Sequence, residues 1–257
     1  MRRGVPLLVA LAALVAGCGE SEPVQAVRVL QLTPATVLPA PAAGGGGQAV
    51  HVMARVAKAA PTPAQTAAAA YPVVQVPNVG SIAVDATNGG RLVNGLQLPV
   101  QGPYWVTWDA VLGRVPNRAE RRWGTDRLIS FLVTVLRDYR IAHPAAQRIL
   151  VGDLSRPFGG PFGREFGGLG HASHQNGLDA DVYYPRTDRA LRAPASPQDV
   201  DHALAQDLVS RLVAYGAQFA FVGLHVGLGG PPAVVQAVAH HDDHVHVRIA
   251  NTAPPAG

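Results

Sequence analysis

Two short segments constrain this chain more than any others, and both are rich in histidine. HASHQNGLDAD occupies residues 171–181 and HHDDHVH occupies residues 240–246. Together they hold six of the ten histidines in a chain of 257 residues. Histidines scattered through a core or over a surface would not gather in this way, so we expect the two segments to meet at one site.

The alternation of residue types in both segments predicts β-strands with one polar and one apolar face. Successive side chains of a strand point to opposite faces. His244 and His246 therefore share one face, with Val and Ile residues opposite them. Asp179 and Asp181 share a face in the same way, opposite Leu, Ala and Val. Two such strands side by side would bring imidazole and carboxylate groups together above a buried apolar surface.

These residue types are those of a catalytic zinc site. A catalytic zinc takes three protein ligands and keeps a fourth position for water, whose pKa then falls to about 7. A nearby histidine that is not a ligand can act as base, acid or oxyanion partner. The residues therefore predict a zinc hydrolase that cleaves an amide bond. The alternative is a hydrogen-bonded polar cluster without metal, which would not explain the density of histidines.

The N-terminus is organised as a secretory signal. Arg2 and Arg3 precede an apolar run, residues 5–16, that is too short to cross a bilayer as a helix. The sequence VAGC that ends at Cys18 resembles a bacterial lipobox, which implies cleavage before Cys18 and lipidation of its thiol. Cys18 is the single cysteine, so no disulfide can form within the chain. We expect residues 1–17 to be a lipoprotein signal peptide; the alternative is an ordinary signal with a stray cysteine.

Residues 18–77 are predicted to be a disordered tether behind the lipidated cysteine. PATVLPAPAAGGGG and AAPTPAQTAAAA are nearly uncharged, and they have too few large apolar residues to offset chain entropy. A coil of this length spans roughly 40–45 Å. The predicted location is the periplasm or cell envelope, with a lipid anchor in the outer membrane if the cell has one, since Gly19 rather than Asp follows the cysteine.

Composition argues against a nucleic-acid partner. The formal net charge is +4, which falls to +2 when Arg2 and Arg3 leave with the signal. No Lys/Arg run supports nucleic-acid binding. A mildly basic surface suits an anionic polymer such as cell wall without requiring one.

The order of predicted elements indicates an α+β fold at residues 78–250. Apolar periodicity and turn residues predict a hairpin, several strands, two helices and a frayed tail, with a short buried strand directly after the second helix, within residues 206–223. The first helix is capped by Thr125 or Asp126 and ended by Pro144. The expected positions are a hairpin at 89–99, strands at 102–109, 148–156 and 244–250, helices within 123–143 and from 206, and a tail at 251–257. We expect a small, mostly antiparallel sheet flanked by helices.

The same residues resemble a known family. SHQNGLDAD, with His174 and Asp181 seven apart, and the late His244-x-His246 resemble the lysostaphin, D-Ala-D-Ala peptidase and hedgehog superfamily. The likeness is closer still to the penicillin-insensitive murein endopeptidases. It covers residues 80–249 through GLQLPVQGPYW, RRWGTDRLISFL, VGDLSRPFGGPF, GHASHQNGLDADVYYP and HHDDHVHVRI.

The resemblance implies roles for individual residues. It implies that His174, Asp181 and His246 bind zinc, that His244 is the catalytic histidine and that His241 is a further active-site histidine. It also implies hydrolysis of D-alanyl-diaminopimelate cross-links in peptidoglycan. A zinc D,D-carboxypeptidase or dipeptidase on the same fold, and a non-catalytic zinc- or wall-binding lipoprotein, remain alternatives.

Other residues in and near the two segments are candidates for a second metal site or for orienting a metal ligand. His171 matches a family position for a possible second metal, and Asp179 is a candidate to orient a ligand imidazole. The acidic partners of a second metal are left open among three residues further along the chain: Asp199, Asp201 and Asp207. Family members carry several cysteines that this chain lacks, so its domain must be stabilised by packing.

The remaining candidates have ordinary interpretations. We expect His240 to be a surface loop residue, and Asp242 and Asp243 to form turns or accept hydrogen bonds. Arg156 could pair with a substrate carboxylate, although a plain surface ion pair is at least as plausible.

Overall fold

A computed structural model describes residues 28–29, 71–163 and 171–252. The expected signal peptide, Cys18 and most of the C-terminal tail lie outside the described residues. None of the helices within the described ranges is long and apolar enough to cross a membrane.

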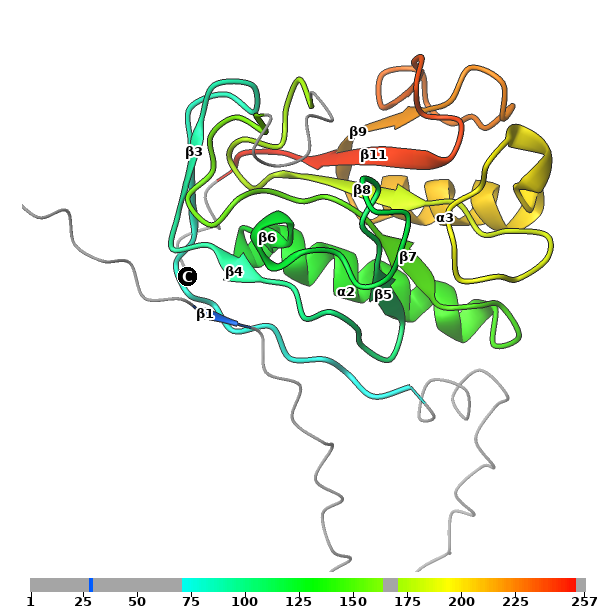
Figure 1. Cartoon of the computed structure of the whole chain (residues 1–257), viewed down its shortest axis with the longest axis horizontal. Coiled ribbons are helices and arrows are strands. Elements are labelled where there is room, and N and C mark those ends of the chain that lie inside the picture. Colours follow the sequence, from blue (N-terminus) through cyan, green and yellow to red (C-terminus); the bar gives the residue numbers. More distant parts are fainter. Residues whose placement is uncertain (1–27, 30–70, 164–170, 253–257) are drawn as a thin grey trace, which may run out of the picture.

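A six-stranded sheet forms the centre of the molecule (Figure 1). In spatial order its strands are β10 (Val235–Ala237), β9 (Ala217–Val222), β11 (His244–Ile249), β8 (Asp179–Tyr183), β7 (Ile149–Val151) and β5 (Trp105–Thr107). The three central pairings are antiparallel, and the pairings at the two edges, β10 with β9 and β5 with β7, are parallel. The α+β prediction with a mostly antiparallel sheet is confirmed.

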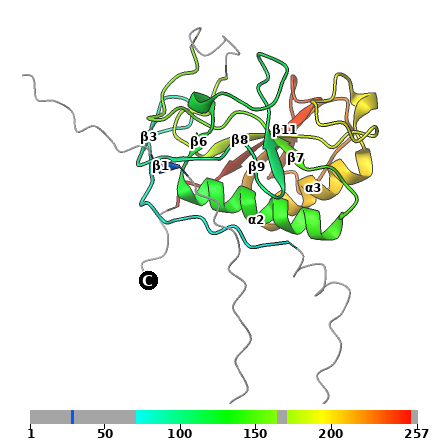
Figure 2. The ribbon, with the colours of Figure 1, turned by 60° about the horizontal axis from the view of Figure 1, so that its bottom comes forward.

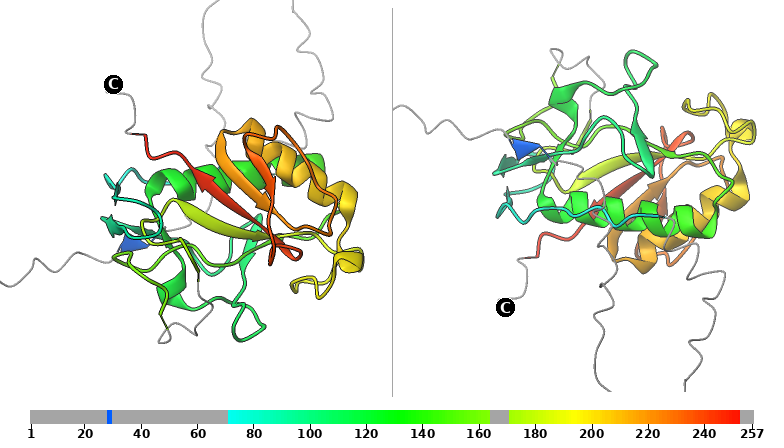
Figure 3. Two further views of the ribbon diagram at one scale, coloured as in Figure 1. Left: turned by 90° about the horizontal axis from the view of Figure 1, so that it is seen from above. Right: turned by 90° about the horizontal axis from the view of Figure 1, so that it is seen from below.

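Two α-helices cover one face of this sheet, as Figures 2 and 3 show. They are α2 (Asp126–Ala142) and α3 (His202–Ala214). Leu128, Leu132 and Leu136 recur at helical spacing and are buried in one core with the apolar side chains of the sheet. Two short 3₁₀ helices, Ala119–Arg121 and Pro197–Asp199, lie in the connections.

The predicted alternation of β8 and β11 is confirmed by their burial and register. Val245 and Val247 join the core beneath the sheet, as do Ala180 and Val182. The two strands pair antiparallel with His246 directly opposite Asp181. The apolar faces therefore pack towards the helices, and the histidines and aspartates share the other face.

The first predicted helix is close to the structure, whereas the second begins earlier than expected. Thr125 caps α2 by accepting the backbone N–H of Leu128, 3.1 Å away. The second helix begins at His202 rather than near Gln206. Its cap is Asp201, which accepts the N–H of Leu204 at 3.2 Å, a local signal that the apolar spacing does not contain.

The predicted hairpin at 89–99 is wrong in its pairing. β3 (Arg91–Val93) pairs with β2 (Ile82–Val84), outside the predicted segment, and the turn lies before Gly90. A Cβ on Gly90 would meet the Val84 carbonyl oxygen at 2.3 Å, so this turn needs a glycine. β4 (Leu96–Gln97) joins a separate small sheet between β1 (Arg28–Val29) and β6 (Trp123–Gly124).

Part of the expected tether is built into the fold. β1 pairs parallel with β4, and residues 71–79 run along α2 (Figure 3, right). Tyr71, Val74 and Val76 pack against the core, and the Arg137 Nε donates to the Tyr71 carbonyl at 3.1 Å. The packed domain therefore includes residues from 71, because these large apolar side chains bury themselves where the Ala-rich segment before them has none.

Thr125 joins α2 to the loop that precedes β8. Its Oγ1 accepts from Leu128 N and also donates to the Gly177 carbonyl at 3.2 Å. Thr125→Ala removes both bonds, and we expect it to lower the free energy of unfolding by about 1–2 kcal/mol. Urea denaturation measures the change. Ser130→Ala, at an exposed position of the same helix, should stay within about 0.5 kcal/mol, and equal losses in both variants would contradict the role given to Thr125.

Candidate metal centre

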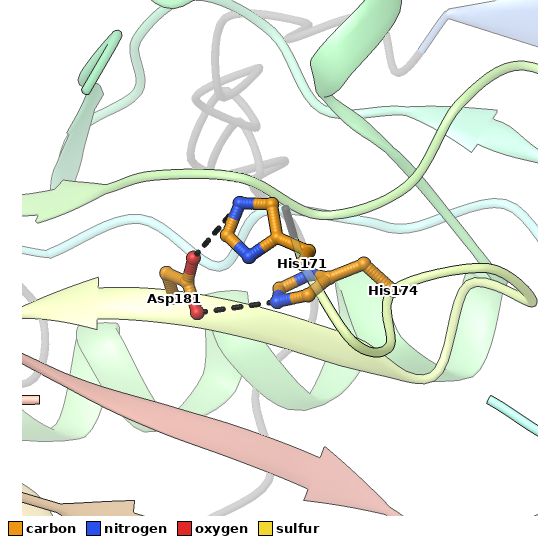
Figure 4. Close-up of side chains that lie close together, drawn as sticks. All are labelled: His171, His174 and Asp181. Carbon is orange, nitrogen blue, oxygen red and sulfur yellow. Dashed lines mark ion pairs between the residues drawn. The ribbon is translucent and has the colours of Figure 1, made fainter. Parts of the chain in front are cut away.

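The candidate site lies on the face of the sheet that the helices leave uncovered. β8 contributes Asp181 and β11 contributes His246, which faces it across the strand pair. His174 comes from the loop before β8. Figure 4 shows His171 and His174 on one side of Asp181, with their imidazoles turned towards its carboxylate.

Three side chains, those of His174, Asp181 and His246, place their candidate metal-ligating atoms at the corners of a small triangle. His174 Nε2 lies 3.2 Å from His246 Nδ1, and each of the two nitrogens lies 3.3 Å from Asp181 Oδ1. In a tetrahedral zinc site with bonds of about 2.0–2.1 Å, neighbouring ligand atoms lie about 3.3–3.4 Å apart. The triangle thus has the dimensions of one face of such a tetrahedron.

The backbone around His174 orients its ring. His174 Nδ1 lies 2.6 Å from the Leu154 carbonyl, which can only accept, so Nδ1 carries the proton and the neutral ring presents a lone pair at Nε2. Burial lowers the pKa of His174, which favours this neutral form. Its φ of 69° is a left-handed conformation that side chains rarely adopt. The loop thus accepts backbone strain at a residue that points into the site.

Asp179 lies beside the imidazole of His246. Its Oδ1 lies 3.2 Å from His246 Nε2, so that Nδ1 faces Asp181 and His174. Burial alone would raise the pKa of Asp179, but its contacts with His246 and Arg248 hold that pKa below its ordinary value. Burial would lower the pKa of His246, and its contacts with Asp179 and Asp181 instead raise it to about 9. Asp179 is thus the ion-pair partner of this imidazole, and His246 Nε2 makes no hydrogen bond within the described residues.

The charge at Asp181 fits a cation. Three carboxylates are buried here, and two have an arginine partner: Asp153 with Arg121 and Asp179 with Arg248. Among the described residues, only histidines form ion pairs with Asp181. Its Oδ1 has no hydrogen-bond partner within the described ranges. Burial would raise the pKa of Asp181, and the surrounding histidines keep it well below its ordinary value. A buried anion in this position is the setting in which proteins hold metal ions.

Two further histidines lie beside the trio. His244 Nε2 is 3.6 Å from Asp181 Oδ1, and its Nδ1 is 2.7 Å from Asp243 Oδ1. Burial would lower the pKa of His244, and Asp181 and Asp243 raise it. The His241 ring lies 4.9 Å from that of His244, with Nδ1 2.7 Å from the Ala239 carbonyl; burial lowers its pKa. The two environments therefore favour opposite protonation states.

His171 belongs to the same cluster through a different carboxylate. Its Nε2 lies 2.8 Å from Asp153 Oδ2 and 3.9 Å from Asp181 Oδ2. His171, His174 and Asp181 each offer a ligand atom within 4.8 Å of one another. Arg121 also pairs with Asp153, and these partners outweigh burial and lower the pKa of Asp153 to about 2. The carboxylate beside His171 is thus already paired with a buried guanidinium.

Comparison with known proteins identifies the family. A family model described as penicillin-insensitive murein endopeptidase matches residues 83–216, just over half of the chain. The chain belongs to this family. The matched region contains His171, His174 and Asp181, and it ends before β9 and β11.

Curated relatives carry the same name. A penicillin-insensitive murein endopeptidase of Pectobacterium atrosepticum is 30% identical over 142 residues, which cover 54% of this chain and 44% of the relative. One of Salmonella arizonae is 33% identical over 141 residues, 52% of this chain and 40% of the relative. Each match covers less than half of the relative's length.

The three acidic candidates for a second metal have other partners in this family member. Asp199 pairs with Arg186, Asp201 caps α3, and Asp207 pairs with His143 and Arg211. Within the described part of the chain, the carboxylates that contact His171 are those of Asp153 and Asp181 and none of these three.

Three other sequence candidates also lie outside the cluster. Asp242 holds the exposed His225, His240 is exposed, and Arg156 Nη1 donates to the Pro161 carbonyl at 2.7 Å.

Sequence reasoning missed Asp153 and Arg121. The backbone of the segment 152–154 hydrogen-bonds both sides of the site: Asp181 N donates to the Asp153 carbonyl at 2.9 Å, and His174 bonds the Leu154 carbonyl. A signal was available in Gly-Asp directly after a buried strand, where a charged residue has to find a partner. Arg121 could not have been matched to it, because the pair spans 32 positions.

The buried ion pair between Arg121 and Asp153 lies on the side of the site that contains His171. Both side chains are buried, so Arg121→Met leaves a buried carboxylate without its arginine and should cost about 3–5 kcal/mol of stability. Chemical denaturation of the variant tests this. Arg192→Met removes an exposed ion pair with Asp188 and should change stability by less than about 1 kcal/mol. A similar small loss in both variants would show that the buried pair contributes little.

Proposed function

We propose that the chain is a zinc endopeptidase that hydrolyses peptide cross-links of the D-alanyl-diaminopimelate type in peptidoglycan. The observation that carries the proposal is the trio His174, Asp181 and His246, whose ligand atoms form a triangle with sides of 3.2–3.3 Å. Membership in the murein endopeptidase family and the names of its relatives support the choice of substrate.

In this proposal the trio holds the metal through His174 Nε2, Asp181 Oδ1 and His246 Nδ1. Zinc in such a ligand set supplies Lewis-acid polarisation of the scissile carbonyl and lowers the pKa of water. The chain's own contribution is orientation. The Leu154 carbonyl fixes the His174 ring, and Asp179 fixes the His246 ring. Such outer contacts keep ligand lone pairs aimed at one point.

His244 and His241 are the proposed proton-handling groups. Asp243 holds Nδ1 of His244, which leaves its Nε2 facing the trio. From there a protonated His244 can donate to a leaving amine or bond a developing oxyanion. A lowered pKa favours a neutral His241 that can accept a proton.

The cellular setting follows from the N-terminus and the substrate. The signal-like residues 1–17 and the lipobox around Cys18 support export and a lipid anchor in the cell envelope. Residues 19–27 lie between Cys18 and β1, the first described strand, and they would connect the domain to a membrane surface.

Digestion of purified cross-linked muropeptides tests the proposed reaction. We expect the mature protein to convert dimers into monomers, identified by mass, and a chelator followed by zinc to abolish and restore this conversion. Release of free D-Ala would instead indicate a carboxypeptidase. Binding to sacculi with identical products before and after chelation would indicate a wall-binding lipoprotein without catalysis.

Substitutions of His246 and His244 should affect zinc binding and catalysis differently. His246→Ala removes a proposed ligand, so we expect loss of both zinc and activity. His244→Ala leaves the trio intact, so it should keep one zinc per chain and lose roughly 10²–10⁴ in rate. Zinc content and the dimer-cleavage rate measure the two effects. His225→Ala, on an exposed loop, is the control; an unchanged rate in His244→Ala would remove its catalytic role.

A further inference from the structure

Arg248 takes no part in the proposed chemistry, yet its guanidinium contacts Asp179, which in turn contacts His174 and His246. It follows His246 by two residues on β11 and therefore lies on the same strand face. Its Nε donates to Asp179 Oδ1 at 2.6 Å and its Nη2 to Asp179 Oδ2 at 3.3 Å. Arg248 is directly opposite Asp179 in the antiparallel pair. Both oxygens of a fully buried carboxylate are thus held by one guanidinium.

Asp179 in turn touches two of the three proposed ligands. Its Oδ1 lies 3.2 Å from His246 Nε2, and its Oδ2 accepts the backbone N–H of His174 at 3.0 Å. The second bond fixes the residue whose backbone is in the left-handed conformation. A rotation of the Asp179 carboxylate would therefore disturb both histidines at once.

The two-point contact with Arg248 opposes that rotation. A guanidinium and a carboxylate form parallel hydrogen bonds that fix the plane of each group, which a lysine ammonium cannot do.

We propose that Arg248 is a positioning residue of the metal centre: through Asp179 it holds His246 with its proton on Nε2 and Nδ1 turned towards Asp181 and His174. This inference rests on the proposed function, because it assigns Arg248 to the same site. An arginine that served only the stability of the sheet would leave metal affinity unchanged.

Zinc affinity, measured by competition with a chromophoric chelator, tests the proposal. We expect Arg248→Met to raise the zinc dissociation constant by roughly 10–100-fold. Arg248→Lys, which keeps the charge without the two-point contact, should fall between wild type and Arg248→Met. The matched control is Arg211→Met: Arg211 is 21% exposed and pairs with Asp207 and Asp138, and Arg248 is 20% exposed. This control should bind zinc as wild type does.

A spectroscopic measurement adds a signature that lost stability would not produce. In the metal-free wild type at a pH above the His246 pKa of about 9, ¹⁵N NMR of His246 should place the proton on Nε2 alone, and Arg248→Met should show the second tautomer. Wild-type affinity and a single tautomer in Arg248→Met would overturn the inference while leaving the zinc hydrolase intact. If Arg248→Met does not fold, wild-type affinity in Arg248→Lys would overturn it. A wild-type chain that binds no zinc would overturn this inference and the proposed function together.

Discussion

The antiparallel register of β8 and β11 is the constraint on which the rest of the site depends. It sets His246 opposite Asp181 and Arg248 opposite Asp179. The register is held by burial, since Val245 and Val247 lie in the core beneath the helices. A slip of one residue would turn the histidines into that core and the valines out of it, so the hydrophobic effect that stabilises the sheet also aligns the polar groups.

The site is supported on its two sides by different means. On one side the backbone of residues 152–154 bonds Asp181 and His174, and the buried pair Arg121–Asp153 lies next to it. On the other side Asp179 contacts His174 and His246 and forms an ion pair with Arg248. Asp181 lies between these ion pairs with histidines as its only ion-pair partners in the described residues. This pattern leaves the negative charge of Asp181 without an arginine partner, and a bound metal cation would balance it.

Short-range patterns predicted the parts of the molecule that alternate or repeat. The period of two in β8 and β11 gave the faces of His246 and Asp181, and Thr125 with the leucine spacing gave the first helix. Contacts between distant segments were beyond such patterns: Arg121 with Asp153, and Arg248 with Asp179. The hairpin was misplaced because apolar alternation does not locate the turn, which requires a glycine at Gly90, where a Cβ would meet the Val84 and Ala86 carbonyl oxygens. The acidic residues after β8 were the least predictable, since their partners lie on other elements.

Anomalous diffraction at the zinc absorption edge tests the central claim most directly. In crystals of the zinc-loaded protein we expect one strong peak about 2.0–2.1 Å from His174 Nε2, His246 Nδ1 and Asp181 Oδ1. A peak bound instead by His171 and Asp153, or no peak at the trio at full zinc loading, would contradict the account.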